Sequence, residues 1–184
     1  MADYAIQSGD YMRPFRMQGS DAGALNYGPE STAQSFVRGQ LLELDSQVST
    51  SNFRLRAALV SASTVTSTSL IGVAAEGASS NTDQTRIYFP INPSIEYQAR
   101  TRGGLIQSTC IGQAYGLFWD STKAVNGVDL ANQVSTSIRV VVTGLIDQPG
   151  DSGGYVRFKF GTPAGSSGLT STNTFGGGAV PIRY

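Results

Sequence analysis

Apolar and polar residues alternate with a period of two along most of the chain between residues 35 and 160. Such alternation is typical of strands that bury one face and expose the other. It predicts strands in the segments 36–44, 53–56, 86–89, 94–100, 105–111, 115–119 and 155–160. A short apolar run at 70–75 predicts a buried strand, with Gly72 as the position for a bulge. A run of β-branched residues predicts a further strand within 137–146.

Proline, glycine and asparagine mark the turns between these strands, which we place at 90–93, 103–104 and 126–127. The hydroxyl-rich segment 61–69 fits either an exposed strand or a long loop, and residues 128–134 are the one place where a helical turn fits. Eight or nine short strands separated by turns predict an all-β fold, as a single small β-barrel or sandwich domain over residues 35–160.

Two segments outside that domain lack a regular period. Residues 1–34 are mostly polar or small, and we expect an extended N-terminal arm, because a disordered tail would hold fewer large side chains than this one: Tyr4, Tyr11, Met12, Phe15 and Met17. Residues 161–184 are rich in glycine, serine and threonine, and we expect a flexible C-terminal tail.

Charge and composition narrow the classes of function. Thirteen basic residues balance thirteen acidic ones, and charged residues make up 14% of the chain against about 25% in an average soluble domain. A single cysteine, Cys110, and the absence of histidine remove the usual ligands of zinc and the means for an internal disulfide. We expect a soluble protein made in a reducing cytoplasm, with no metal, no cofactor, no small-molecule substrate, no nucleic acid and no membrane as partner.

The segment Gly150-Asp151-Ser152-Gly153-Gly154 resembles the nucleophile motif of trypsin-like proteases, and Asp151-Ser152-Gly153 also matches the triplet of aspartic proteases. A serine nucleophile needs a base, and the chain has no histidine; Lys159, on the following strand, is expected to be solvated and protonated. The aspartic triplet normally follows an apolar strand, whereas Gln148, Pro149 and Gly150 precede it here. We therefore predict that residues 147–153 form a hairpin loop between the last two strands.

Other candidate groups also have structural interpretations. Glu43 and Asp45 are two residues apart and share a strand face, where we expect solvated carboxylates; a glycosidase pair remains open on carboxylates alone. We expect Cys110 to be a small core residue. The sequence predicts no catalytic, cofactor-binding or metal-binding residues and no enzyme.

The layout of the chain resembles that of the head decoration, or cement, proteins of tailed bacteriophages: an all-β domain with an aromatic-containing arm and a Gly/Ser/Thr-rich tail, and the stretches 70–74, 95–99, 111–115 and 150–160. The resemblance covers residues 35–160. It implies a non-enzymatic virion structural protein, often a homotrimer, that is made in the host cytoplasm. It also implies that the protein binds the capsid exterior where major capsid protein subunits meet.

Two alternatives from other classes stay open. A carbohydrate-binding β-sandwich of a tail or spike would use exposed aromatic side chains, with candidates Tyr88, Tyr97, Tyr115 and Trp119. A self-assembling tail-tube or shell protein would also combine strands with terminal arms.

Overall fold

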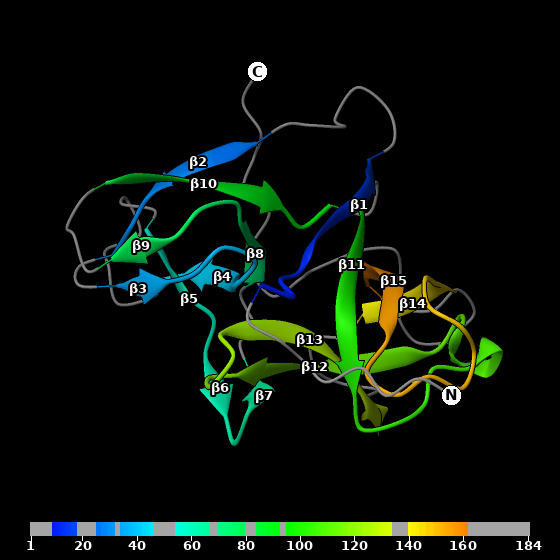
Figure 1. The fold of residues 1–184 in the computed structure, drawn as a ribbon. Coiled ribbons are helices and arrows are strands. Elements are labelled where there is room, and N and C mark those ends of the chain that lie inside the picture. The colour runs from blue at the N-terminus through cyan, green and yellow to red at the C-terminus, as the bar shows by residue number, and fades with distance from the viewer. Residues whose placement is uncertain are drawn as a thin grey trace, which may run out of the picture.

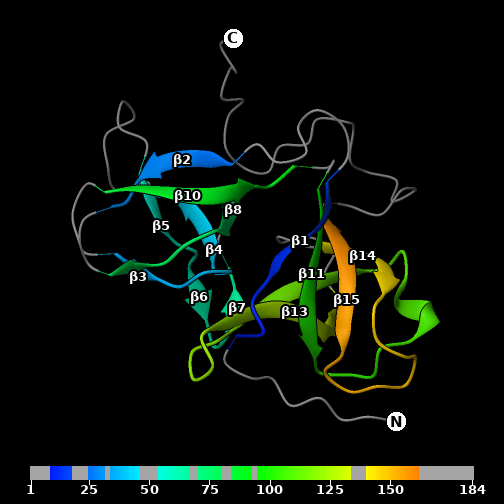
Figure 2. The same ribbon diagram turned by 45° about the horizontal axis from the view of Figure 1, so that its top comes forward.

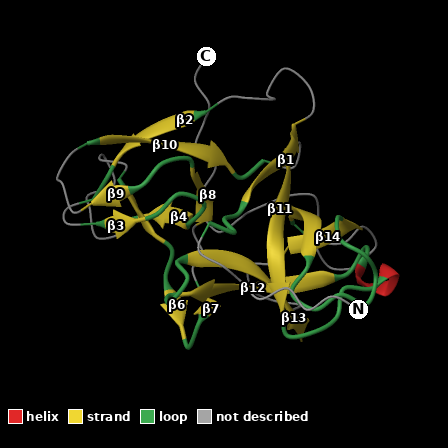
Figure 3. Cartoon of the chain, viewed as in Figure 1, coloured by secondary structure: helices red, strands yellow, loops and turns green. Residues whose placement is uncertain are grey.

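The computed structural model describes residues 9–17, 25–31, 34–45, 54–66, 70–79, 84–92, 95–133 and 140–161. The described residues are almost entirely strands and loops (Figures 1 and 3), so the predicted all-β class is confirmed. The elements are β1 (Arg13–Met17), β2 (Asn26–Pro29), β3 (Ser35–Phe36), β4 (Leu41–Leu44), β5 (Leu55–Ala57), β6 (Val60–Ser61), β7 (Thr64–Val65), β8 (Leu70–Ala74), β9 (Ala78–Ser79), β10 (Thr85–Pro90), β11 (Ile95–Arg102), the 3-10 turn η1 (Ser108–Cys110), β12 (Ala114–Asp120), β13 (Val125–Gln133), β14 (Val140–Leu145) and β15 (Tyr155–Phe160).

Five strands of the larger sheet close into a ring, in the order β11, β15, β14, β12 and β13. Four of its five pairings are antiparallel, and the fifth joins β13 to β11 in parallel through Thr101↔Val128 and Arg102↔Asp129. The strand β1 extends this sheet along the first half of β11 (Figure 2). The short hairpin β6–β7 extends it beside β12 (Figure 1).

A glycine permits the parallel closure of this first ring. A Cβ at Gly127 would lie 2.5 Å from a ring carbon of Phe118 and closer still to the carbonyl oxygen of Arg100. Any side chain at this position would push β13 away from β11, so the bare backbone lets the two strands meet.

The second sheet, of strands β2, β10, β8, β4 and β5, closes as well. Its two end strands meet where Glu30, directly after β2, forms a parallel bridge with Leu55 of β5, and Ser31 N donates to Leu55 O at 2.8 Å. A separate two-stranded ribbon, β3 with β9, adds Phe36 and Ala78 to the core of this second ring. The described strands thus form two rings and a ribbon, whereas we expected a single barrel or sandwich.

One hydrophobic core joins the two rings. Leu41, Leu70 and Val73 of the second ring pack with side chains of the first ring, whose interior holds Tyr97, Ala99, Leu117, Val128, Val140, Val142, Val156, Phe158 and Phe160. Asn126 of β13, 2% exposed, bridges the rings: its Oδ1 accepts from Leu41 N and its Nδ2 donates to Phe118 O, both at 2.9 Å.

The alternation predicted for the segments 94–100 and 155–160 is confirmed in β11 and β15. Residues of β11 and β15 are buried at every second position, and Val156, Phe158 and Phe160 all face the core as predicted. Two of these side chains surround Tyr97, with ring centroids 6.0 Å away for Phe158 and 5.2 Å for Phe160. Aromatic packing of this kind adds about 1 kcal/mol per pair beyond the buried area.

The expected extended arm over residues 1–34 is corrected by the structure. Residues 13–17 form β1 and pair with β11, residues 26–29 form β2 and pair with β10, and Met12 is 1% exposed within the core. A register shift between Pro14 and Arg16 interrupts β1, so Phe15 breaks the alternation and is 44% exposed. Residues 1–8 of the arm and 162–184 of the tail lie outside the described residues.

Asn126 and Gly127 do not form the predicted turn, and residues 128–133 are strand rather than a helical turn. The chain turns four residues earlier, where Asp120 Oδ1 accepts from Thr122 N at 2.9 Å and Lys123 N at 3.1 Å. Asp120 therefore marks the turn, because its side chain accepts from the backbone of the following residues, and the Asn126-Gly127 pair does not.

Other boundaries also differ from the predictions. Residues 37–40 form a turn that splits the strand expected at 36–44, with Gly39 at φ +80°. The segment 105–111 holds the turn η1 instead of a strand, and the described part of 61–69 is the tip of the β6–β7 hairpin and β7. The bulge expected at Gly72 lies one residue earlier: Leu42 pairs Gly72 and Glu43 pairs Leu70, which leaves Ile71 as the extra residue.

Replacing Met12 tests whether the segment before β1 belongs to the core. Met12→Ala should lower the free energy of unfolding by about 3 kcal/mol, the usual cost of emptying a buried methionine site. Phe15→Ala, at a neighbouring exposed position, should cost less than about 1 kcal/mol. Urea denaturation of both variants measures the difference, and equal small effects would show that residues 9–17 are an undocked arm.

Candidate functional site

The protease-like segment Gly150–Gly154 lies in the loop between β14 and β15, as predicted for a hairpin connection. Gly150 and Gly153 have φ values of +99° and +68°, a left-handed backbone that glycine adopts without strain. Each is placed where the chain reverses direction. The sequence of the loop is therefore explained first by its backbone conformation.

The loop is paired with the chain that follows β11. Gly150 N donates to Ile106 O at 2.7 Å, Ile106 N donates to Asp151 O at 2.9 Å, and Ser152 forms an antiparallel bridge with Leu105. Asp151 is 5% exposed and Ile106 is fully buried. The motif is thus tied to the segment after β11 by two backbone hydrogen bonds and one isolated bridge.

Asp147 fixes the return into β15. Its Oδ2 accepts from Tyr155 N at 2.7 Å. Gly154 lies directly beneath this contact, since a Cβ there would lie 3.2 Å from Asp147 and 2.8 Å from Ile106 Cδ1. The oxygen of Gly154 accepts from both the backbone N and the Oγ1 of Thr101, at 3.0 and 3.1 Å.

A cluster of charged and aromatic side chains covers the loop. Arg100 Nε lies 3.1 Å from Asp10 Oδ2, its Nη1 lies 3.9 Å from Asp147 Oδ2, and the same Nη1 donates to Gly153 O at 3.2 Å. The guanidinium stacks on Tyr155, 4.3 Å from the ring centroid, while Tyr155 Oη donates to Asp10 Oδ1 at 2.9 Å. Asp10 thereby ties the N-terminal segment to the loop.

The phenol of Tyr155 is held protonated. Burial, followed by the hydrogen bond and the charge of Asp10, raises the pKa of Tyr155 from 10.0 to about 12. A proton donor that holds its proton this firmly can orient the Asp10 carboxylate. It is poorly suited to proton transfer near neutral pH, where an effective acid has a pKa close to the ambient pH.

The contacts of the residues in both protease-like motifs are structural. Within the described chain no side chain hydrogen-bonds Ser152 Oγ, and Lys159 points to the half-exposed side of β15 with Tyr155 and Arg157. Asp151 contributes its backbone N and O to the loop, donating to Gln148 O at 3.1 Å. What the arrangement does is hold the loop and the N-terminal segment against the ring.

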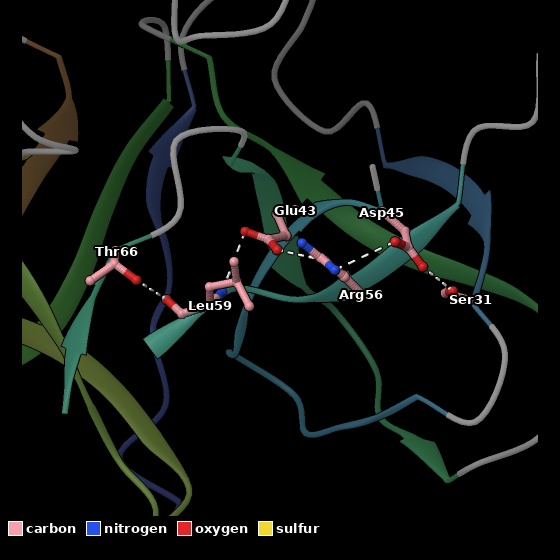
Figure 4. Close-up of polar contacts among 6 residues, drawn as sticks. All are labelled: Ser31, Glu43, Asp45, Arg56, Leu59 and Thr66. Atoms are coloured by element: carbon pink, nitrogen blue, oxygen red, sulfur yellow. Dashed lines mark hydrogen bonds and ion pairs between the residues drawn. The ribbon is translucent and has the colours of Figure 1, made fainter. Parts of the chain in front are cut away.

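Glu43 and Asp45 share Arg56, as expected for residues on one strand face, but Glu43 is not solvated: it is 1% exposed (Figure 4). Arg56 Nε lies 2.6 Å from Glu43 Oε1 and its Nη1 lies 3.5 Å from Asp45 Oδ1. Leu59 N donates to Glu43 Oε2 at 3.3 Å, and Ser31 Oγ donates to Asp45. The expectation of free surface carboxylates was wrong because Arg56, opposite Glu43 in the β4–β5 register, neutralises them.

The aromatic residues proposed for sugar binding are mostly interior. Tyr88, Tyr97 and Tyr115 are 6%, 0% and 4% exposed, and only Trp119 is half-buried. Burial raises the pKa of all three tyrosines, with Cys110 as a further cause at Tyr115. Cys110 is 7% exposed in the core cluster, which confirms it as a small core residue.

Sequence reasoning did not find the Asp10–Arg100–Tyr155 cluster. The alternation of β15 did predict that Tyr155 and Arg157 share the face opposite the core, and β11 places Arg100 next to Tyr155 in register. No local signal linked Asp10 to residues ninety or more positions away, because the contact depends on β1 pairing with β11.

Paired substitutions in the loop test whether the motif is structural. Asp147→Ala removes the acceptor of Tyr155 N and should lower the free energy of unfolding by about 1.5 kcal/mol, as for a bond to a charged group. Ser152→Ala should change it by less than about 0.5 kcal/mol. Both are measured by urea denaturation. Covalent labelling of Ser152 by a serine-directed phosphonate would contradict the structural role.

The raised pKa of Tyr155 predicts a pH dependence of stability. Because the unfolded tyrosine loses its proton near pH 10 and the folded one near pH 12, its contribution is present below pH 10 and is lost as the pH rises through 12. The difference in free energy of unfolding between the protein and Tyr155→Phe should therefore shrink from pH 10 to 12. Urea titrations of both proteins across that range measure it; a constant difference would show that Tyr155 titrates normally.

Comparison with known proteins adds no relative. The chain matches no protein-family model, no curated protein and no solved structure among those searched. Among the described residues there is no helix long and apolar enough to cross a membrane, and no group of three or more His, Cys, Asp or Glu side chains placed to hold a metal ion.

Proposed function

We propose that this protein is a non-enzymatic virion structural protein that binds the outer surface of a phage capsid and stabilises the contacts between major capsid protein subunits. The observation that carries the proposal is the placement of exposed apolar side chains on the outer strands. Tyr27 on β2 is 63% exposed, Leu59, directly before β6, is 53% exposed, and Val60, the first residue of β6, is 38% exposed.

Outer strands of this kind suit contact with other proteins. Within the described residues, β6 pairs only with β7, so its outer side remains available for pairing with a neighbouring chain, whereas the end of β2 is already bridged to β5 through Glu30 and Leu55. Weak contacts repeated by the symmetry of a shell, and linked within an oligomer, give strong attachment without high affinity at each site. A homotrimer would present three such sets.

The distribution of charge supports a protein partner. The formal net charge is zero, and the charges near the rings are used internally, in the pairs Glu30–Arg86, Glu43–Arg56, Asp10–Arg100 and Asp129–Arg102. Binding to a long polyanion depends on many unpaired cations, whose counterion release supplies the affinity. A neutral surface suits the exterior of a shell better than contact with the packaged genome.

The fold buries most of the side chains on which the carbohydrate-binding alternative depends. Three of the four aromatic side chains on which it rested are core residues, and Tyr97 Oη donates to Pro90 O at 2.7 Å rather than facing a ligand. The self-assembling tube or shell alternative uses the same outer strands as the capsid proposal. The behaviour of the isolated protein separates these two.

Sedimentation with undecorated capsids tests the proposal. The purified protein should remain a small oligomer in solution, measured by its mass, and should pellet with capsids. Tyr27→Ser should reduce the pelleted fraction without unfolding the domain, because Tyr27 is largely exposed. Lys123→Gln, an exposed change in the β12–β13 turn, is the matched control and should bind normally.

Two results would count against capsid binding. The first is that the protein stays in the supernatant with every capsid tried, which would contradict capsid binding. Rings or tubes formed by the protein alone would favour the self-assembling alternative.

A further inference from the structure

Two arginines flank one tyrosine where the two rings meet. The guanidinium carbon of Arg38 lies 4.7 Å from the centroid of the Tyr11 ring, and that of Arg13 lies 5.6 Å from it. Arg13 belongs to β1 of the larger sheet, and Arg38 belongs to the turn between β3 and β4. Both arginines are exposed, and Tyr11 is half-buried between them.

Neighbouring residues fix the position of each member of this Arg13–Tyr11–Arg38 site. With its amide oxygen turned toward β1, Gln98 of β11 accepts from Arg13 Nε at 2.7 Å and from Nη2 at 2.9 Å. Gln40 N donates to Val37 O at 3.1 Å and closes the turn that carries Arg38. Gly39, at φ +80°, follows Arg38 in this turn, the position that requires a left-handed residue in a type II turn.

Tyr11 is fixed by close packing against the same turn. A Cβ at Gly39 would overlap the Cβ of Tyr11 and lie 2.9 Å from Met12 O, so the turn and the N-terminal segment touch backbone to backbone. The next residue, Met12, is anchored in the core at 1% exposure. The two charges are therefore presented on a rigid base, which lowers the entropy lost when a partner binds.

Within the described part of the chain, the two arginines of this site form no ion pair with a carboxylate. Five other described arginines, at positions 56, 86, 100, 102 and 157, each lie within 4.0 Å of a carboxylate oxygen. Neither Arg13 nor Arg38 has such a partner among the described residues, and both residues are exposed. Two exposed guanidinium groups beside one aromatic ring form a site of local positive charge in a chain of zero net charge.

We infer that the Arg13–Tyr11–Arg38 site binds the carboxylate side chains of an acidic segment in a partner protein. A guanidinium matches a carboxylate with two parallel hydrogen bonds. The ring of Tyr11 gives the apolar part of a glutamate or aspartate a surface to pack on. Two cations provide little of the counterion release on which nucleic-acid binding depends.

This inference names the chemistry of the partner's contact residues and rests on the proposed function only for the identity of the partner. If the partner is a major capsid protein, the acidic segment lies on its outer surface. The experiment below uses no capsid, so its failure and the failure of capsid binding are distinguishable.

The test is titration of the ¹⁵N-labelled protein with an oligoglutamate peptide at low salt, followed by NMR. Shifts should concentrate at Tyr11, Arg13, Arg38 and Gly39 and should weaken as salt is added. Arg13→Gln and Arg38→Gln should each weaken binding about threefold, and the double variant about tenfold, as for exposed ion pairs. Lys123→Gln removes one exposed charge elsewhere and should bind like the unchanged protein. An equal urea midpoint for all variants will confirm that each of them is folded.

Three results would overturn the inference. The first is no shift at the site with oligoglutamate. The second is equal binding by the double variant, or equal binding of an oligoglutamine peptide by the unchanged protein. The third is tighter binding of inorganic phosphate or of a single-stranded oligonucleotide through the same two arginines, which would assign the site to phosphate groups.

Discussion

The side chain of Asn126 holds the two rings of this protein together. Its amide accepts from the backbone of β4 and donates to the backbone of β12, with 2% of the residue exposed. A buried N–H or C=O without a partner costs about 1–3 kcal/mol, so both backbone groups need what Asn126 supplies. Aspartate lacks the donor and leucine lacks both groups, so the junction between the rings specifies this residue type.

Each ring closes beside an arginine–carboxylate pair. The first closes where Arg102 pairs with Asp129 in register, and Arg102 Nη2 lies 2.8 Å from Asp129 Oδ2. The second closes at Glu30, fully buried, whose Oε2 lies 2.8 Å from Arg86 Nε and whose carbonyl accepts from Arg54 at 3.1 Å. Buried ion pairs add little net stability compared with apolar residues of similar size, but breaking one leaves a costly buried charge. We infer that these pairs favour the closed register over a shifted one.

The sequence predicted the elements that depend on local pattern and missed those that depend on strand neighbours. The alternation in 155–160 placed Val156, Phe158 and Phe160 correctly because one face of β15 is buried throughout. The same reasoning failed at 13–17, where a register shift at Phe15 breaks the period, so a strand at the edge of the larger sheet resembled an arm. The expected exposure of Tyr88, Tyr97 and Tyr115 was also wrong, because the sequence of a strand does not show which of its faces another sheet will cover.

The protease-like loop and the Arg13–Tyr11–Arg38 site are joined by four consecutive residues of the N-terminal segment. Asp10 turns toward Arg100 and Tyr155 and is used to hold the loop, Met12 enters the core, and Arg13 faces outward. Because Arg100 neutralises Asp10, this acidic residue does not cancel the charge of Arg13, although the two are close in sequence. Asp10 is thus paired beside the loop, while Arg13, three residues later, is exposed. The motif that resembles a catalytic one is linked to this segment through Arg100, which donates to Gly153 O and pairs with Asp10.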